Sequence, residues 1–155
     1  MTLIKIGKIV NTHGIKGELR LLSKFPYKDK VFINNMTIYI DKKDKEIINT
    51  YRKHKNFDMI TLKDYNNINE VLKYKGKNVY VNDSDINLDN NKYLDEELIG
   101  LNVIYEDNNK GTIVDIERYD KTVLFNIKNN DKEYLIPYND NIIAVSYTHL
   151  TLPTI

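Results

Sequence analysis

Short runs of β-branched and aromatic residues, separated by turn residues, recur along the first half of the chain. They occupy residues 3–10, 17–22, 37–40, 47–54, 59–62 and 77–81. Apolar and polar residues alternate in 3–9 and 78–81, as in strands with one buried face. One short helix is expected before the last strand, with Asn67 or Asn69 as its N-cap and Gly76 after its end. Several strands at this spacing favour a closed barrel.

A second β-rich block follows an Asp- and Asn-rich stretch, residues 83–91, which we interpret as a linker. Its expected strands are 98–105, 111–117, 123–127 and 133–137. The expected hairpin turns are 107–111 and 128–132. We therefore expect a mainly β chain of two small β-barrels joined by a short linker. The expected domains are residues 1–82, with one short helix, and residues 92–145.

The last ten residues, 146–155, differ in composition from the rest of the chain. They contain no Lys, Asp, Glu or Asn, which are frequent before them. The stretch is similar to translated adapter sequence, and we interpret it as a non-native tail. The alternative is a genuine apolar terminal strand.

Composition narrows the class of protein. The 155 residues include no cysteine, which excludes disulfides, thiolate zinc sites and cysteine nucleophiles. No apolar run approaches the length of a membrane span, and the N-terminus lacks the apolar core of a signal peptide. We therefore expect a cytoplasmic protein.

Charge is distributed unevenly. Residues 1–30 hold seven Lys or Arg against two acidic residues, a net charge of +5, and residues 83–109 hold one against eight, a net charge of −7. A basic half suits phosphate, and an acidic half suits a basic protein. The alternative is that both are ordinary solvated faces.

The turn between the first two expected strands is the strongest candidate site. It reads His13-Gly14-Ile15-Lys16-Gly17-Glu18, and Arg20 follows in the second strand. Glycine adopts backbone angles that other residues avoid, so this turn can hold its polar side chains in a fixed place. No helix follows, which argues against a dinucleotide fingerprint. One histidine and one carboxylate form a weak catalytic set, so binding is favoured over catalysis.

Other basic and aromatic residues extend this candidate surface. Lys24, like Lys16 and Arg20, is a candidate for phosphate contact. Nearby aromatic residues that could stack on bases are Phe25, Tyr27 and Phe32. For Phe25 and Phe32, filling of the barrel is the favoured interpretation. The basic run at 52–55, Arg-Lys-His-Lys, lies at an expected hairpin tip, where it either reinforces the surface or is a solvated turn.

A second candidate surface opens the second block. Its residues are Tyr93, Leu94, Asp95, Glu96 and Glu97. Tyr93 is expected to be exposed, as aromatic residues at protein interfaces are, and the three carboxylates suit a basic partner. A first helical turn that favours carboxylates is the alternative. Leu98 and Ile99 are expected to enter the core, and Gly100 permits a bend.

Five segments in this order resemble the ribosome maturation factor RimM family of 16S rRNA processing proteins. They are 13–18 (HGIKGE), 69–77 (NEVLKYKGK), 97–100 (ELIG), 111–114 (GTIV) and 135–138 (LIPY). The resemblance implies a translation-factor-like N-terminal barrel and a PRC-barrel, here truncated. Leu94 departs from the family, which usually carries a second tyrosine there, and Glu97 stands where Asp is usual.

The resemblance implies a non-enzymatic assembly chaperone that binds the head of the immature 30S subunit and promotes late 16S rRNA processing. The implied partners are ribosomal protein S-nineteen and 16S rRNA, with no cofactor, metal or membrane, and a monomer is expected. The expected contacts with rRNA or the ribosome are His13, Gly14, Lys16, Gly17, Glu18, Arg20 and Lys24. The expected contacts with the ribosomal protein are Tyr93, Leu94, Asp95, Glu96 and Glu97. Two alternatives stay open: a PRC-barrel adaptor that binds only proteins, and a small enzyme that uses the His13 loop.

Overall fold

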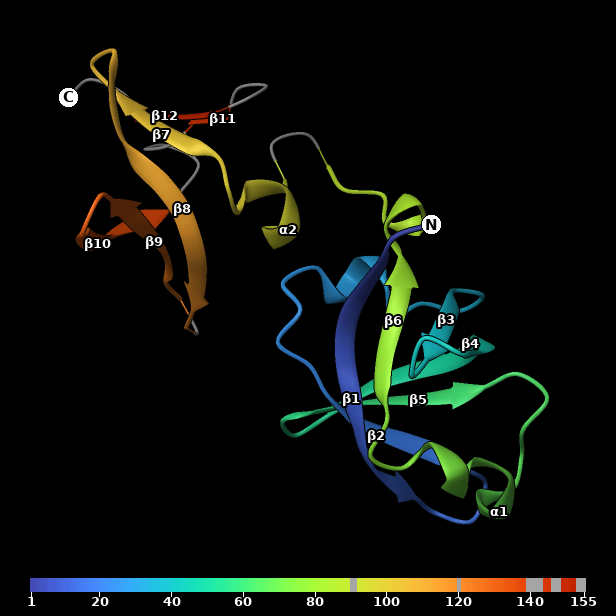
Figure 1. The fold of residues 1–155 in the computed structure, drawn as a ribbon. Coiled ribbons are helices and arrows are strands. Elements are labelled where there is room, and N and C mark those ends of the chain that lie inside the picture. The colour runs from blue at the N-terminus through green and yellow to red at the C-terminus, as the bar shows by residue number, and fades with distance from the viewer. Residues whose placement is uncertain (90–91, 120, 139–143, 146–148, 153–155) are drawn as a thin grey trace. The chain divides into compact units, whose positions relative to one another are not determined.

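The computed structural model describes residues 1–89, 92–119, 121–138, 144–145 and 149–152. The chain divides into two compact units, Met1–Leu88 and Asp89–Ile155, and each unit has its own β-sheet (Figure 1). The prediction of a mainly β chain is confirmed, and a second closed barrel stays a prediction, because the described strands of the second unit form a sheet with two edges. The domain limits 1–82 and 92–145 stay predictions, and residues 90–91 of the expected linker lie outside the described residues.

Six strands form the first sheet. They are β1 (Leu3–His13), β2 (Glu18–Leu22), β3 (Thr37–Ile40), β4 (Asp44–His54), β5 (Phe57–Leu62) and β6 (Asn78–Asn82). Their order, β1-β2-β5-β4-β3-β6, closes into a barrel, because β1 pairs with β2 on one side and with β6 on the other. Alternate aliphatic side chains fill the interior; fully buried examples are Ile9, Leu19, Leu21, Ile38, Ile60 and Val79.

Strand β1 is long and bent, which lets it pair along both edges. Its register shifts between Lys5 and Gly7 against β6, and between Ile9 and Asn11 against β2. Such bulges increase the local bend and twist of a strand. At Gly7 a Cβ atom would lie 3.0 Å from the carbonyl oxygen of Leu22, so glycine permits the close approach of β2.

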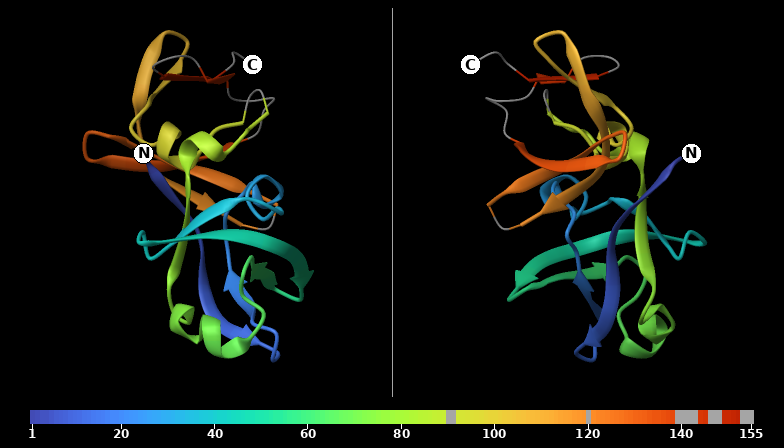
Figure 2. Two further views of the ribbon diagram at one scale, coloured as in Figure 1. Left: turned by 90° about the vertical axis from the view of Figure 1, so that its right-hand side faces the viewer. Right: turned by 60° about the vertical axis from the view of Figure 1, so that its left-hand side comes forward.

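Short helices join the strands of the first unit. They are the 3-10 turns η1 (Lys28–Lys30), η2 (Leu72–Tyr74) and η3 (Asp83–Asp85), and the helix α1 (Ile68–Val71). The expected helix is confirmed, and Asn67 caps it, because its side chain accepts from the Asn69 N–H at 2.8 Å. Both views of Figure 2 place this segment beside the turn that joins β1 and β2. Where the structure describes the chain, every helix is too short or too polar to cross a membrane.

The second unit begins with the helix α2 (Asp95–Leu98), and six strands follow. They are β7 (Asn102–Tyr105), β8 (Asn108–Arg118), β9 (Val123–Asn129), β10 (Lys132–Tyr138), β11 (Ala144–Val145) and β12 (His149–Leu152). The order is β10-β9-β8-β7-β12-β11, so β10 and β11 are the edges of the described sheet. Its core is small, with Val103, Ile113 and Phe125 at its centre and the Phe125 ring stacked on Tyr138 at 4.8 Å.

Strand β12 belongs to the stretch that we interpret as a non-native tail. It pairs in parallel with β7, with His149 opposite Asn102 and Leu152 opposite Tyr105. Residues 146–148 and 153–155 of that stretch lie outside the described residues. The non-native origin of the stretch stays a prediction.

Candidate nucleic-acid interface

The turn between β1 and β2 is fixed by its two glycines. Gly14 and Gly17 have φ angles of +75° and +89°, a region that favours glycine. A Cβ atom on Gly17 would lie 3.1 Å from the carbonyl oxygen of Asn67, so this glycine also lets α1 approach the turn. The Ile68 N–H donates to the carbonyl of Ile15 at 2.9 Å. The turn therefore has one defined conformation, anchored to α1.

Pairing between β1 and β2 brings His13 and Arg20 together. Arg20 lies opposite Asn11, and its Nη2 donates to Nδ1 of His13 at 3.0 Å. The Arg20 guanidinium carbon lies 5.0 Å from the centre of the Phe57 ring, a cation–π contact. His13 and Arg20, both predicted site residues, are thus hydrogen-bonded to each other, and the Phe57 ring on β5 holds the Arg20 guanidinium.

Glu18 is paired with Arg52 on β4. Arg52 donates from Nε and Nη2 to the two carboxylate oxygens at 2.9 and 2.7 Å, a bidentate pair. The hydrogen bonds from Arg52, together with its positive charge, lower the pKa of Glu18 against the opposing effect of burial. A carboxylate held in this way is a poor general base, which weakens the alternative of a small enzyme at this loop.

The basic run at 52–55 lies at the tip of the β4–β5 hairpin, as expected from the sequence. The His54 ring centre lies 6.1 Å from that of His13. Burial lowers the pKa of His54, and the positive charges of Arg52 and Lys55 lower it further. The sequence showed the basic run but not its place beside His13, because that depends on the pairing of β2 with β5 and of β5 with β4.

The two predicted lysines do not lie together. Lys16 is exposed within the β1–β2 turn, beside the His13 cluster in sequence. Lys24 follows the other end of β2, where Leu22 pairs with Lys8. The structure therefore brings together His13, Glu18 and Arg20 with the turn that contains Lys16, and it places Lys24 at the opposite end of β2.

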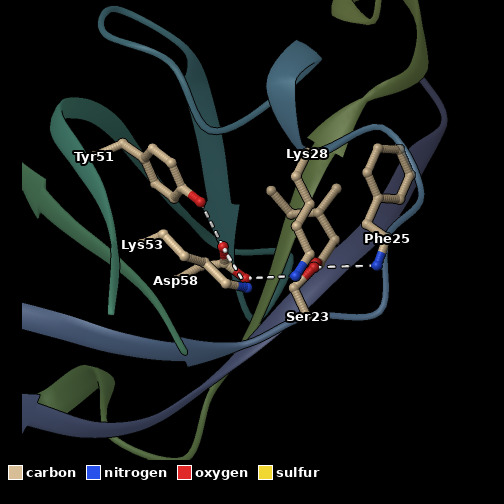
Figure 3. Close-up of polar contacts among 7 residues, drawn as sticks. Ser23, Phe25, Lys28, Tyr51, Lys53 and Asp58 are labelled. Carbon is tan, nitrogen blue, oxygen red and sulfur yellow. Dashed lines mark hydrogen bonds and ion pairs between the residues drawn. The ribbon is translucent and has the colours of Figure 1, made fainter. Parts of the chain in front are cut away.

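A buried carboxylate that sequence reasoning missed, Asp58 on β5, gathers a tyrosine and two lysines around it. Asp58 is fully buried; the Tyr51 hydroxyl donates to it at 2.6 Å, and Lys28 lies 2.9 Å from its second oxygen (Figure 3). Lys53 lies 3.7 Å away. Burial, and next the bond to Asp58, raises the pKa of Tyr51 to about 12. The charges of Lys28 and Lys53 are thus partly neutralised by Asp58.

The aromatic residues near Lys24 have mainly structural contacts. Phe32 is buried and stacks on Tyr51 at 5.5 Å, as the core interpretation predicted. Phe25 is half-buried; its backbone N–H donates to the Ser23 hydroxyl at 3.1 Å (Figure 3). It packs edge-on against Tyr27, with ring centres 5.9 Å apart. In this arrangement Phe32 is unavailable for stacking on bases.

The second candidate surface is partly corrected by the structure. Tyr93 is half-buried against the core of its unit and Leu94 is buried, so the expectation of an exposed Tyr93 is wrong. Both pack inward because they lead into α2, whose Leu98 belongs to the same core. Ile99, expected in the core, is 44% exposed because the chain turns there into Gly100, which has a φ angle of +96°.

The three carboxylates, Asp95, Glu96 and Glu97, lie in the first turn of α2. The alternative interpretation of this segment, a first helical turn that favours carboxylates, predicted this position. Glu97 accepts from the Leu94 N–H at 3.1 Å, and Asp95 forms an ion pair with Arg118 on β8. Glu96 and Glu97 are exposed. Two of the five predicted contact residues therefore retain exposed acidic side chains.

Comparisons with known proteins agree with these features. A family model described as the RimM N-terminal domain matches residues 4–86. "Ribosome maturation factor RimM" of Bacillus mycoides is 36% identical over 146 residues, which are 89% of this chain and 85% of the relative. The protein of the same name from Shouchella clausii is 34% identical over 146 residues, 89% of this chain and 84% of the relative.

A solved structure shares the fold of the first unit. The solution structure of the N-terminal domain of RimM from Thermus thermophilus covers 57% of this chain and 98% of its own, with a TM-score of 0.50 and 18% sequence identity. The family model spans more than half of the chain, and the relatives exceed 30% identity over most of it. The chain therefore belongs to the RimM family of ribosome maturation factors.

Proposed function

We propose that this protein is an assembly chaperone that binds the head of the immature 30S subunit and promotes late processing of 16S rRNA. The observation that carries the proposal is its 34–36% identity, over 89% of the chain, to proteins named ribosome maturation factor. A chaperone of this kind works by differential affinity: it binds one conformation of the subunit head more tightly than the others. Moderate affinity then allows release when the head has matured.

The first unit is proposed to contact rRNA through the basic end of its barrel. The contact residues there are His13, Gly14, Lys16, Gly17, Glu18 and Arg20, with Lys24 as a separate contact at the other end of β2. Support comes from Arg20, which stacks on Phe57, and from Lys16, which is exposed. Hydrogen bonds from lysine and arginine side chains to phosphate oxygens position proteins on the nucleic-acid backbone. Glu18 contributes indirectly, by holding Arg52.

The second unit is proposed to bind ribosomal protein S-nineteen through the α2 segment, residues 93–97. Exposed carboxylates on Glu96 and Glu97 suit a basic partner. The inward packing of Tyr93 and Leu94 makes them supports for the helix more than contacts. In this proposal, basic residues of the first unit bind rRNA, and acidic residues of the second unit bind the ribosomal protein.

The alternatives are less well supported. A protein-only adaptor is expected to lack a positive surface on the first barrel, yet Arg20 at the barrel end has no carboxylate partner in the described part of the chain. A small enzyme at the His13 loop would need a free carboxylate to act with the histidine, and Glu18 is engaged by Arg52.

Co-sedimentation tests the proposal. The purified chain is mixed with immature and with mature 30S particles at low ionic strength, and the pellets are assayed for it. We expect it to pellet with immature particles and to remain largely in the supernatant with mature ones. A chain that stays in the supernatant with both, while its circular dichroism shows it folded, contradicts the proposed function.

A further inference from the structure

We propose that Arg20, His13 and His54 form one binding site for a phosphodiester group of RNA, with Arg20 as its fixed cation. The inference rests on the proposed rRNA-binding role of the first unit and names the side chains that carry it out. The three residues come from β2, β1 and β4, and they meet at one end of the barrel.

Arg20 supplies a positive charge with no carboxylate partner among the described residues. One Nη2 hydrogen is donated to His13, and the guanidinium group stacks on Phe57. Its Nε is shielded from solvent and meets no acceptor in the described part of the chain. The plane of the group is therefore fixed from two sides, while its other Nη hydrogens can bind an acceptor. Such a fork matches the oxygens of a phosphate.

His13 supplies a second hydrogen-bond donor. Arginine can only donate, so Nδ1 of His13 must be the acceptor of their hydrogen bond, and the neutral ring carries its hydrogen on Nε2. The side chain of His13 is exposed. Its Nε2–H can therefore donate to an oxygen atom that approaches from solvent.

His54 completes the site from the neighbouring hairpin. Its ring centre lies 6.1 Å from that of His13, a span that an oxygen can bridge by accepting from one nitrogen of each ring at about 2.7–3.2 Å. Burial and the surrounding cations lower its pKa, which favours the neutral ring in the absence of a ligand. A bound phosphodiester brings negative charge and reverses that balance, so binding is coupled to proton uptake by His54.

The charged groups around His54 come from every neighbouring element. Arg52 on β4, Lys55 in the hairpin turn and Arg20 on β2 oppose its protonation. The other titratable neighbour is His13 on β1, whose ring is neutral while its Nδ1 accepts from Arg20. The nearby carboxylate is Glu18, and Arg52 neutralises it through two hydrogen bonds. The cluster therefore has an excess of positive charge at the place where the anion is expected.

Histidine NMR signals test the site directly. The imidazole signals of the full chain are followed during titration with inorganic phosphate and with a short single-stranded RNA, and His149 is the reference. We expect the signals of His13 and His54 to shift saturably with RNA, and the pKa of His54 to rise in the complex. A shift with phosphate alone identifies an anion site that does not receive RNA and overturns the proposal. So does the absence of any shift.

A pair of variants separates the imidazole from general charge. RNA affinity of the native chain is expected to be higher at pH 6 than at pH 7.5, by up to about tenfold for a pKa rise of one unit in His54. His54→Gln is expected to remove this dependence on pH. Lys55→Gln removes a full charge from the same hairpin and is expected to weaken binding at both pH values while it keeps the dependence. A pH dependence unchanged in His54→Gln overturns the proposal.

These outcomes differ from those of the proposed function. A chain that pellets with immature 30S particles, but whose His13 and His54 signals do not respond to RNA, keeps the function and loses this site. A chain that fails to pellet loses the function, whether or not the two signals respond.

Discussion

Arg52 on β4 binds both carboxylate oxygens of Glu18 on β2, although β5 lies between their strands. The pair ties the β4–β5 hairpin to the β1–β2 turn. It fixes the end of the barrel at which Arg20 meets His13. Arg52 also neutralises the negative charge of Glu18, which would otherwise repel an anion at this end of the barrel.

Glu18→Gln is expected to lower the stability of the first unit at neutral pH but not in acid. Arg52 lowers the pKa of Glu18, so the stabilisation is present above the ordinary carboxyl pKa and is lost as pH falls through the lowered value. We expect Tm to fall by about 2–4 °C at pH 7. Thermal unfolding of variant and native chain should converge near pH 3. A deficit that persists there contradicts the role of the ion pair.

Gly17→Ala is expected to destabilise the chain more than Gly14→Ala. Both positions have a positive φ, which costs an alanine about 1 kcal/mol. At Gly17 the new methyl group also meets the Asn67 carbonyl at 3.1 Å, whereas at Gly14 it meets nothing within 4 Å. Urea unfolding followed by circular dichroism should give about 2 kcal/mol or more for Gly17→Ala and about 1 kcal/mol for Gly14→Ala. Equal losses would show that contact with α1 is unimportant.

Asp58→Asn is expected to be destabilising, because the buried carboxylate accepts from the Tyr51 hydroxyl and pairs with Lys28 and Lys53. We expect a loss of about 2 kcal/mol in urea unfolding. The matched control is Asp41→Asn, which breaks an exposed ion pair with Lys77 at 3.5 Å and should cost less than about 0.5 kcal/mol. Similar losses in the two variants would mean that the Asp58 cluster does not organise this part of the barrel.

Local sequence patterns predicted most of the strands, the Asn67 cap and the glycine turn, because each depends on neighbouring residues. The place of His54 beside His13 depends on strand order, and the pattern of residues in β4 does not contain that information. Asp58 was missed for a related reason: a lone carboxylate in a strand gives no sign that Tyr51 and Lys28 will surround it. Tyr93 was expected to be exposed because aromatic residues are favoured at protein interfaces, and the sequence pattern does not show that it packs against the core of its unit.

The most direct test of the central claim is the salt dependence of affinity for immature 30S particles. The native chain is compared with a double variant, Lys16→Gln with Arg20→Gln, and with a control, Lys43→Gln with Lys45→Gln, in the exposed β3–β4 hairpin. Circular dichroism first verifies that each variant is folded. We expect the affinity of the native chain to fall steeply with salt, and the slope of the logarithmic plot to decrease by about 1–2 in the double variant only. An affinity of the native chain that stays flat across salt contradicts contact between this end of the barrel and rRNA phosphates.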